Sequence, residues 1–292
     1  MVNLIVHADD FGLSRKVNEG IVLAHREGIL TSTSLTACGA AFEPAIELAE
    51  TTPSLDIGVH LTLVEEKPVL DPARIPSLVG SDGRFHSHAS GFFKKYLTGR
   101  IHLREIRDEL EGQMKKIFTQ GIKVSHLDSH QHLHVLPGIL RITADLAKAY
   151  GVPAIRLPRE RLPWRMQLQG SPSRLLQMRV LNFFGWLGKG LIELRADSFF
   201  GFLAGGELNK KNLRQILEVL PPKGACELMC HPGLEDRETA YRHWNYRWQE
   251  ELDALIDPEI ADFIREREIR LSSFRELAGW HALPIAASSA SR

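Results

Sequence analysis

The segment richest in side chains that could bind a metal or catalyse a reaction is Ser125-His-Leu-Asp-Ser-His-Gln-His-Leu-His134. It contains four histidines and an aspartate. In an extended strand these five side chains would share one side, whereas a helical turn after Ser129 would fan them around the end of the strand. Packing so many imidazoles together without a cation would leave buried donors and acceptors unmatched. Imidazole and carboxylate groups are natural ligands of zinc and similar divalent ions. The segment therefore predicts a metal or catalytic site, with a surface histidine patch as the alternative.

Two adjacent carboxylates, Asp9 and Asp10, lie where the first apolar run of the chain ends, in His7-Ala-Asp-Asp-Phe-Gly12. In α/β barrels the carboxyl ends of the strands are where catalytic groups gather. One carboxylate could bind a cation while the other accepts a proton, if their surroundings separate their pKa values. The same residues could instead form a turn and cap a helix that begins after Ser14. Taken alone, this segment leaves both interpretations open.

Two further histidines lie near the ends of apolar runs. His60 belongs to the run 56–63, where a lone histidine is more often a hydrogen-bonded core residue than a ligand, so its role depends on its neighbours. His231 ends the run 225–230 and precedes Pro232 and Gly233, which would brace it as a general acid. The alternative for His231 is a turn residue without chemistry.

These residues need a scaffold that brings distant segments together. Short β-branched runs alternate with longer segments of helical periodicity, which is the pattern of βα units around a parallel sheet. About seven strands in a chain of this length favour an irregular (β/α) barrel, similar to a TIM barrel, over an open doubly wound sheet. No GxGxxG or GxxxxGK[ST] phosphate-binding motif is present. The expected strands are 3–8, 31–37, 56–62, 122–128, 153–157, 225–230 and 269–273, and the expected helices are 16–28, 42–50, 103–119, 138–150, 209–219 and 258–267.

One barrel domain is expected over residues 1–280, with excursions at about 64–99 and 158–202 and a disordered tail at 281–292. The second excursion mixes arginines with apolar and aromatic residues. It predicts either a buried helix with a basic rim or an amphipathic surface that meets a lipid or a lipid-like substrate. In the second case the side chains facing the lipid would be Trp164, Phe183, Phe184 and Trp186.

Composition narrows the class of protein. The chain has 292 residues, 43% of them hydrophobic, and 36 basic residues balance 36 acidic ones, so no global field favours nucleic acid as a partner. No apolar run reaches the roughly 18 to 20 residues that a membrane-spanning helix needs, and the N-terminus lacks the pattern of a signal peptide. Three cysteines are too few for a disulfide framework, and Cys226 and Cys230 are expected in the core. A cytoplasmic protein is therefore expected.

Five segments carry the candidate residues in a fixed order: His7-Ala-Asp-Asp-Phe-Gly-Leu-Ser14, Thr31-Ser-Thr-Ser34, Gly58-Val-His60, His126-Leu-Asp-Ser-His-Gln-His-Leu-His134 and Cys230-His-Pro-Gly233. Together they resemble the YdjC-like carbohydrate deacetylases, a family that includes the chitooligosaccharide deacetylases. Because the segments run from residue 7 to residue 233, the resemblance covers most of the chain, and it is specific in combination.

The resemblance implies an irregular (β/α) barrel that removes the acetyl group from an N-acetylated amino sugar with one divalent metal ion. Carried over position by position, Asp10, His60 and His130 would bind the ion, Asp9 would be the general base, and His231 would protonate the departing amine. An amide is a poor electrophile with a poor leaving group, which is why such a site needs a metal, a base and an acid. The sequence leaves open which of Asp9 and Asp10 contacts the metal.

The remaining polar residues of these segments would support the site by fixing the tautomers of the ligands or by contacting substrate. They are Asp128, His7, His126, His132 and His134. The mixed set of carboxylate and imidazole groups admits zinc or magnesium first, and also manganese, nickel or cobalt.

The second excursion resembles the branch of the family associated with hopanoid biosynthesis, whose substrate is a glycosylated triterpenoid lipid carrying N-acetylglucosamine. An N-acetylated glycoside or glycolipid is therefore the expected substrate, and contact with the inner face of the membrane is an accompanying expectation. Alternatives are a deacetylase of soluble chitooligosaccharides, a barrel metallohydrolase of a phosphoester or cyclic amide, and an inactive sugar- or lipid-binding homologue. The phosphoester alternative expects cationic side chains around the metal, which are scarce beside these motifs. The sequence does not determine the oligomeric state, and it is compatible with a homo-oligomer.

Overall fold

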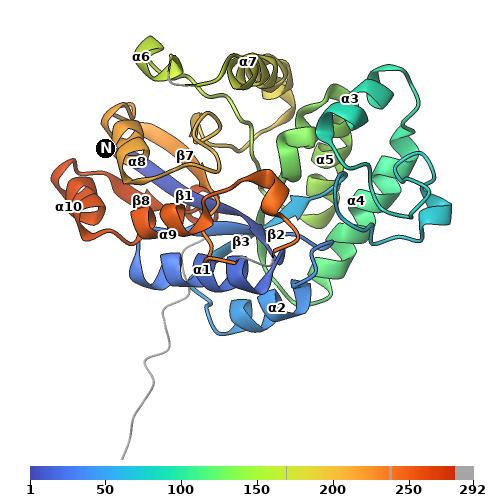
Figure 1. Ribbon diagram of the computed structural model, residues 1–292, viewed down its shortest axis with the longest axis horizontal. Helices are drawn as coiled ribbons and strands as arrows, with labels where there is room; N and C mark the ends of the chain where they lie inside the picture. Colours follow the sequence, from blue (N-terminus) through green and yellow to red (C-terminus); the bar gives the residue numbers. More distant parts are fainter. Residues whose placement is uncertain (169, 237–238, 280–292) are drawn as a thin grey trace, which may run out of the picture.

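The computed structural model describes residues 1–168, 170–236 and 239–279. Within them, a curled parallel sheet is surrounded by helices (Figure 1). The strands follow the order β5-β4-β3-β2-β1-β7-β6, and β8 pairs with β1 outside this path. The predicted α/β fold with an irregular, barrel-like sheet is confirmed. The strands are β1 (Val2–Phe11), β2 (Ser32–Leu35), β3 (Asp56–Leu61), β4 (Val124–Ser129), β5 (Ala154–Ile155), β6 (Ser198–Phe200), β7 (Gly224–Cys230) and β8 (Arg270–Ser272).

Strand β1 differs from the other strands of this sheet because it pairs with three strands. One edge pairs with β7 along its length, from Val2 opposite Gly224 to Ala8 opposite Cys230. The other edge pairs with β8 in its first half and with β2 in its second half. All of these pairings are parallel, so the carboxyl ends of the strands meet at one end of the sheet. The candidate site residues that end these strands are brought together for this reason.

The curl of the sheet brings its edge strands, β5 and β6, toward each other. Isolated parallel bridges join Ala154 to Leu194 and Glu160 to Phe199, and the Ile155 amide donates a hydrogen bond of 3.1 Å to the carbonyl oxygen of Leu194. The barrel is irregular because these bridges replace a continuous ladder between β5 and β6.

Six helices begin and end within one residue of their predicted positions. Their apolar residues recur at helical spacing, so each buries one face against the sheet, as α1 does with Val17, Ile21 and Ala24. The N-cap of α1 is Ser14, whose side chain accepts a hydrogen bond from the amide of Val17. The six are α1 (Arg15–Glu27), α2 (Phe42–Glu50), α4 (Leu103–Phe118), α5 (Pro137–Tyr150), α8 (Lys210–Glu218) and α10 (Pro258–Glu266).

Other elements were not predicted. Both excursions contain regular structure, including strand β6, because the tertiary fold stabilises segments whose sequence shows weak periodicity. The expected excursions at about 64–99 and 158–202 therefore contain helices of their own, while the tail expected at 281–292 lies outside the described residues. The additional helices are α3 (Ala89–Leu97), α6 (Trp164–Gln167), α7 (Pro172–Leu187), α9 (Trp248–Leu255) and α11 (Phe274–Leu277), with short 3-10 helices η1 (Pro72–Arg74), η2 (His130–Val135), η3 (Gly188–Leu191) and η4 (Arg242–Trp244).

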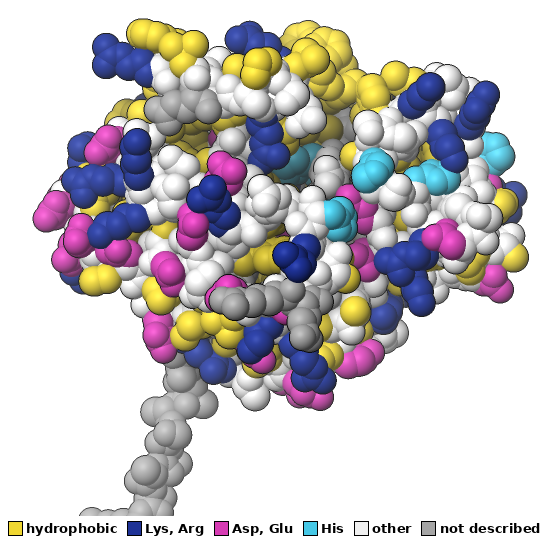
Figure 2. Space-filling view, viewed as in Figure 1, with side chains coloured by type: hydrophobic (Ala, Val, Ile, Leu, Met, Phe, Trp, Pro, Cys, Tyr) yellow, Lys and Arg dark blue, Asp and Glu magenta, His cyan; other side chains and the backbone are white. Residues whose placement is uncertain are grey.

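Helix α7 lies at the periphery of the molecule rather than in its core. Its buried residues are Met178, Leu181 and Gly185, so the alternative of a buried helix is wrong. Figure 2 shows apolar side chains gathered at the top of the view, over α6 and α7, with basic side chains beside them. In the part of the chain that the structure describes, no helix combines the length and the apolar character needed to cross a membrane.

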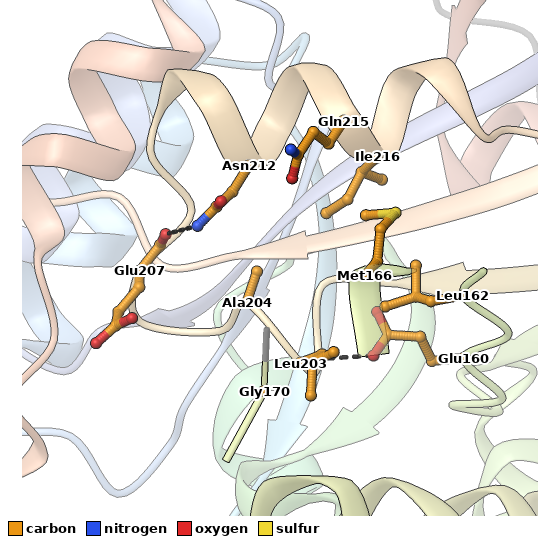
Figure 3. Close-up of a pocket in the computed structure, with 10 residues that line it drawn as sticks. All are labelled: Glu160, Leu162, Met166, Gly170, Leu203, Ala204, Glu207, Asn212, Gln215 and Ile216. Atoms are coloured by element: carbon orange, nitrogen blue, oxygen red, sulfur yellow. Dashed lines mark hydrogen bonds between the residues drawn. The ribbon is translucent and has the colours of Figure 1, made fainter. Parts of the chain in front are cut away.

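Glu160 anchors the second excursion to the sheet. Its Oε1 accepts a hydrogen bond of 2.6 Å from the Gly201 amide, and its Oε2 accepts one of 2.8 Å from the Leu203 amide. Burial raises the pKa of Glu160 to about 7, although these backbone donors act in the opposite direction. Figure 3 shows Glu160 in the wall of a small hollow of about 90 Å³ beside α6, whose lining contains none of the predicted site residues.

The segment after β7 is clamped between two helices. The Gly233 amide donates to the carbonyl oxygen of Trp248 in α9, and the Leu234 amide donates to that of Lys16 in α1. Gly20 of α1 faces this segment, and a Cβ added there would lie 2.8 Å from the carbonyl carbon of Gly233. Close packing of two backbones is possible here only because Gly20 has no side chain.

We predict that Gly20→Ala lowers the free energy of unfolding by about 1 to 3 kcal/mol, because the added methyl group overpacks a backbone contact. Gly91→Ala in α3 is the matched control, since nothing lies within 4 Å of its added Cβ. Because alanine favours the helix more than glycine does, Gly91→Ala should raise the free energy of unfolding by about 0.5 to 1 kcal/mol. Urea unfolding of both variants measures the difference, and equal stability of the two would contradict the packing described here.

Candidate metal and catalytic site

The backbone turns at the end of β1, within the register shift between Ala8 and Phe11, and directs Asp9 and Asp10 toward the same site. Adjacent residues of an extended strand point to opposite faces, but Asp10 has a φ of 69°, in the left-handed region. This conformation is unfavourable for a residue other than glycine and has to be held by its surroundings. The Asn18 side chain holds this turn, since it accepts a hydrogen bond of 2.7 Å from the Gly12 amide and donates one to the carbonyl oxygen of Ala41.

Three of the predicted residues, Asp10, His60 and His130, form a buried triad at the ends of β1 and β3 and the start of η2. Asp10 Oδ1 lies 3.3 Å from His60 Nε2 and 3.3 Å from His130 Nδ1. One ligand atom from each residue lies within 4.8 Å of the other two. The structure thus brings together residues separated by up to 120 positions in the sequence.

Both imidazoles of this triad have a carboxylate behind them. His60 Nδ1 lies 2.9 Å from Asp128 Oδ1, and His130 Nε2 lies 3.0 Å from Glu65 Oε2. An ionised carboxylate accepts hydrogen bonds only, so each of these nitrogens is the donor. The other nitrogen of each ring, which faces Asp10, is then left with a lone pair when the ring is neutral.

This donor set fits a divalent cation. His60 Nε2 is buried and has no hydrogen-bond partner, and both ring lone pairs converge on an oxygen of Asp10. Burial lowers the pKa of His60, but the charge of Asp128 and the contact with Asp10 outweigh it and raise the pKa to about 10. For His130, burial likewise acts against Asp10 and Glu65, which raise its pKa to about 9. The site therefore requires positive charge, which either protons or one metal ion with open coordination positions can supply.

Two other groups of residues have metal-ligand spacing, His7 with His126 and Asp128, and Asp9 with His60 and Asp128. Both depend on Asp128, whose oxygens already contact His60, Ser34 and Arg156. The triad of Asp10, His60 and His130 has no such competition. It is therefore the best candidate for a metal site in the described part of the chain.

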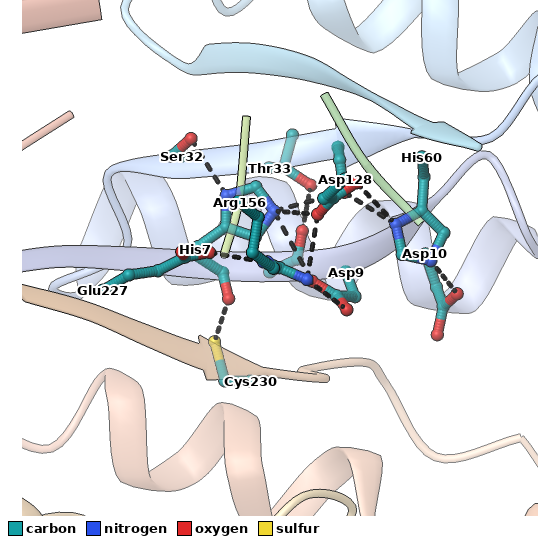
Figure 4. A network of polar contacts seen from close by, with 12 residues as sticks. His7, Asp9, Asp10, Ser32, Thr33, His60, Asp128, Arg156, Glu227 and Cys230 are labelled. Atoms are coloured by element: carbon teal, nitrogen blue, oxygen red, sulfur yellow. Dashed lines mark hydrogen bonds and ion pairs between the residues drawn. The ribbon is translucent and has the colours of Figure 1, made fainter. Parts of the chain in front are cut away.

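Arg156, just after β5, pairs with three buried carboxylates (Figure 4). It donates two hydrogen bonds to Asp9, of 2.7 and 2.9 Å, and lies 3.0 Å from Asp128 Oδ2 and 2.6 Å from Glu227 Oε1. Burial alone would raise the pKa of Asp9, but Arg156 lowers it, so Asp9 is ionised. The two parallel hydrogen bonds also fix the orientation of the carboxylate.

Arg156, Glu227 and Glu65 were not among the residues predicted from the sequence. A charged residue inside the short apolar run 152–157 was the available signal for Arg156, because buried arginines are almost always paired. Glu227 offered the same signal in β7. Glu65 had none, because it lies in the first excursion and reaches His130 through a left-handed φ of 71°.

His231 directly follows β7, whose last residue, Cys230, pairs with Ala8, the residue before Asp9. Its backbone amide donates a hydrogen bond of 2.5 Å to Glu251 Oε2. Its ring is buried, with Nδ1 4.0 Å from the same oxygen, and packs 4.7 Å from the ring of Tyr246. Trp244 stacks on His130 at 5.0 Å, so the segment around η4 covers the site, a contribution that the sequence analysis also missed.

The other predicted histidines occupy different surroundings. Strand β4 ends at Ser129, and Gln131 and His132 have positive φ values, so the residues fan around the strand end rather than sharing one side. His7 lies 3.3 Å from Asp128 Oδ2, next to the network. His126 stacks on Phe274 at 4.0 Å, and His134 bridges Ser129 Oγ and the carbonyl oxygen of Arg156. His126 and His134 therefore make packing and hydrogen-bond contacts with residues outside the triad of Asp10, His60 and His130.

The chain is similar to proteins that are already known. A family model described as YdjC-like protein matches residues 3–266. The chain belongs to the YdjC-like family. This YdjC-like chain is 34% identical to a protein from Brevibacillus brevis named carbohydrate deacetylase, over 94% of this chain and 100% of that protein. It is 30% identical to a Serratia marcescens protein named chitooligosaccharide deacetylase, over 94% and 98%.

A solved structure is also similar to the YdjC-like chain. It is the crystal structure of a candidate cellobiose-phosphate cleavage protein from Enterococcus faecalis, with a TM-score of 0.73 and 27% identity. The similarity covers 94% of this chain and 98% of that one.

We predict that Arg156→Met lowers the free energy of unfolding by about 3 to 5 kcal/mol, because three buried carboxylates lose their cation. The control is Arg107→Met, which breaks an exposed ion pair with Asp145 and should cost less than about 1 kcal/mol. Urea unfolding monitored by circular dichroism measures both. If the YdjC-like protein tolerates the two substitutions equally, Arg156 does not hold the network together.

Proposed function

We propose that this protein is a metal-dependent hydrolase that removes the acetyl group from an N-acetylated amino sugar. The observation that carries the proposal is the buried triad of Asp10, His60 and His130 beside Asp9, with His231 directly after the neighbouring strand β7. Relatives named carbohydrate deacetylase and chitooligosaccharide deacetylase support the reaction class. In this proposal Asp10, His60 and His130 hold one divalent ion.

Each of the remaining groups has a separate role in amide hydrolysis. A divalent ion bound at the triad would polarise the acetyl carbonyl and lower the pKa of an attacking water. Asp9 accepts the proton of that water, and its paired hydrogen bonds to Arg156 keep one orientation throughout. His231 donates a proton to the amide nitrogen, because an unprotonated amine is a poor leaving group. Asp128 and Glu65 each accept a hydrogen bond from one imidazole, of His60 and His130 respectively. They thereby fix the tautomer in which the unprotonated ring nitrogen faces Asp10.

Variants of the adjacent acids separate ligand from base. We predict that Asp10→Asn and His130→Ala lose bound metal together with activity, whereas Asp9→Asn and His231→Asn retain metal and lose about 10²- to 10⁴-fold in kcat. Metal content by mass spectrometry and acetate release from N-acetylglucosamine conjugates, with and without a chelator, provide the measurements. Asp145→Asn, at an exposed position, is the control for a loss of carboxylate charge.

Two results would contradict these roles. Activity that survives both a chelator and Asp9→Asn removes the mechanism. Loss of metal in Asp9→Asn, with retention in Asp10→Asn, exchanges the roles of the two acids. An inactive sugar-binding homologue, the alternative from a different class, predicts binding of the conjugates without any release of acetate.

For the substrate, we propose a glycolipid, with the N-acetylglucosamine of a glycosylated hopanoid as the specific candidate. A groove of about 350 Å³ runs between α3, η2 and α7 and is lined by apolar side chains that include Phe93, Leu181 and Phe184. Gln131 and His132, which directly follow the proposed ligand His130 in the sequence, also line it, so one end of the groove lies on the segment that carries this ligand. Such a groove would accommodate an apolar aglycone. A soluble chitooligosaccharide is the alternative, favoured by the names of relatives such as the Serratia marcescens protein.

We predict that Phe184→Ser raises KM for an N-acetylglucosaminyl hopanoid by more than about tenfold, since a buried aromatic contact is worth about 1.5 to 3 kcal/mol. Turnover of chitobiose should not change, because its sugar rings do not need the groove. Phe118→Ser, at a partly buried phenylalanine outside the groove, is the matched control. Equal turnover of both substrates by the wild type, with no effect of Phe184→Ser on either, removes the glycolipid from the proposal.

A further inference from the structure

Exposed apolar side chains are concentrated in one segment of this protein. Eleven large hydrophobic side chains are exposed in the described part of the chain, and eight of them lie between residues 164 and 191, on α6, α7 and η3. Single exposed apolar residues are normal, but a contiguous group marks an interaction surface. We refer to this group as the α6–α7 surface (Figures 1 and 2). Its members are Trp164, Leu168, Leu176, Val180, Phe183, Trp186, Leu187 and Leu191.

The same segment is strongly basic. From Arg161 to Ile192 the sequence contains five basic residues and no aspartate or glutamate, although the whole chain has no net charge. Two acids flank this segment: Glu160 is buried and accepts hydrogen bonds from backbone amides, and Glu193 is exposed. Within the described residues, neither Arg161 nor Lys189 forms an ion pair with a carboxylate. In the described part of the chain, these two positive charges of the α6–α7 surface are therefore not neutralised by ion pairs.

A pocket at the edge of this surface combines both properties. It measures about 330 Å³ and is lined by Arg159, Arg161, Arg179, Asn182, Phe183 and Trp186. Burial and the neighbouring charges of Arg161 and Arg195 lower the pKa of Arg159, so like charges are crowded here. Guanidinium groups bind phosphate through paired hydrogen bonds, and the two aromatic rings offer an apolar wall next to them.

The charge distribution decides between two occupants of this surface. A second copy of the chain related by a two-fold axis would set the same patch against itself, bringing arginines against arginines. A bilayer that contains anionic phospholipid supplies phosphate groups for the arginines and an apolar layer for the tryptophan and phenylalanine rings. We propose that the α6–α7 surface docks on an anionic membrane, with a lipid phosphate in the pocket between Arg159, Arg161 and Arg179.

Docking of the α6–α7 surface on a membrane would affect the position of the substrate groove, because α7 contributes to the surface and to the groove. Leu181 and Phe184 line the groove, while Phe183 and Trp186 are exposed on the docking surface. Docking would place the outer end of the groove near the bilayer. The docking itself does not rest on the proposed deacetylase activity, and vesicle binding can be measured without any substrate.

The test is co-sedimentation of the full chain with vesicles. The wild type should bind vesicles of equal parts phosphatidylglycerol and phosphatidylcholine and bind pure phosphatidylcholine at least about tenfold more weakly, since each basic residue near an anionic surface contributes roughly fivefold. Phe183→Ser with Trp186→Ser, and separately Arg161→Gln with Arg179→Gln, should each reduce binding by about tenfold or more. Leu103→Ser and Arg104→Gln, at exposed positions on α4, are the matched controls and should leave binding unchanged.

Three outcomes overturn the proposal: equal binding to both kinds of vesicle, binding that is insensitive to the α6–α7 substitutions, or a wild-type dimer that these substitutions convert to a monomer. The last result would identify a second copy as the occupant. Acetate release from chitobiose distinguishes this proposal from the previous one, because the α6–α7 variants should retain it. Vesicle binding without any deacetylation would leave the docking surface intact and remove the proposed function.

Discussion

The single guanidinium of Arg156 holds together the carboxylates at the centre of this barrel. It contacts Asp9 from β1, Asp128 from β4 and Glu227 from β7, and all four side chains are buried. Three buried carboxylates without a cation would repel one another and lose their hydration, at a cost of several kcal/mol for each ion. The arginine therefore makes it possible for acidic residues of three different strands to converge.

This pairing divides the work of two neighbouring residues. Both oxygens of Asp9 are bound by Arg156, whereas Asp10 turns away through its left-handed backbone and faces His60 and His130. The same carboxylate that Arg156 contacts in β4, Asp128, also orients His60. The base and the metal ligands are thus connected by one network, and a change at Arg156 reaches both.

The second excursion links this centre to the exterior. Glu160 fastens it to the backbone next to β6, and α7 then runs with one side along the groove and the other in contact with solvent. A helix with apolar residues on both sides cannot bury both within a single barrel wall. One side of α7 therefore lines the groove beside η2, and the other side forms part of the basic, aromatic α6–α7 surface.

The sequence by itself determined the elements with strong periodicity and the residues at their ends. Six helices, most of the strands and the segments that hold Asp10, His60, His130 and His231 follow from apolar spacing and from histidines and acids placed after apolar runs. The tertiary structure decided which of these side chains meet, because the left-handed turns at Asp10, Glu65 and His132 and the strand register direct them. It also decided the roles of Arg156 and Glu65. Their partners are distant in the sequence, and no local pattern encodes a contact that forms only when the sheet curls.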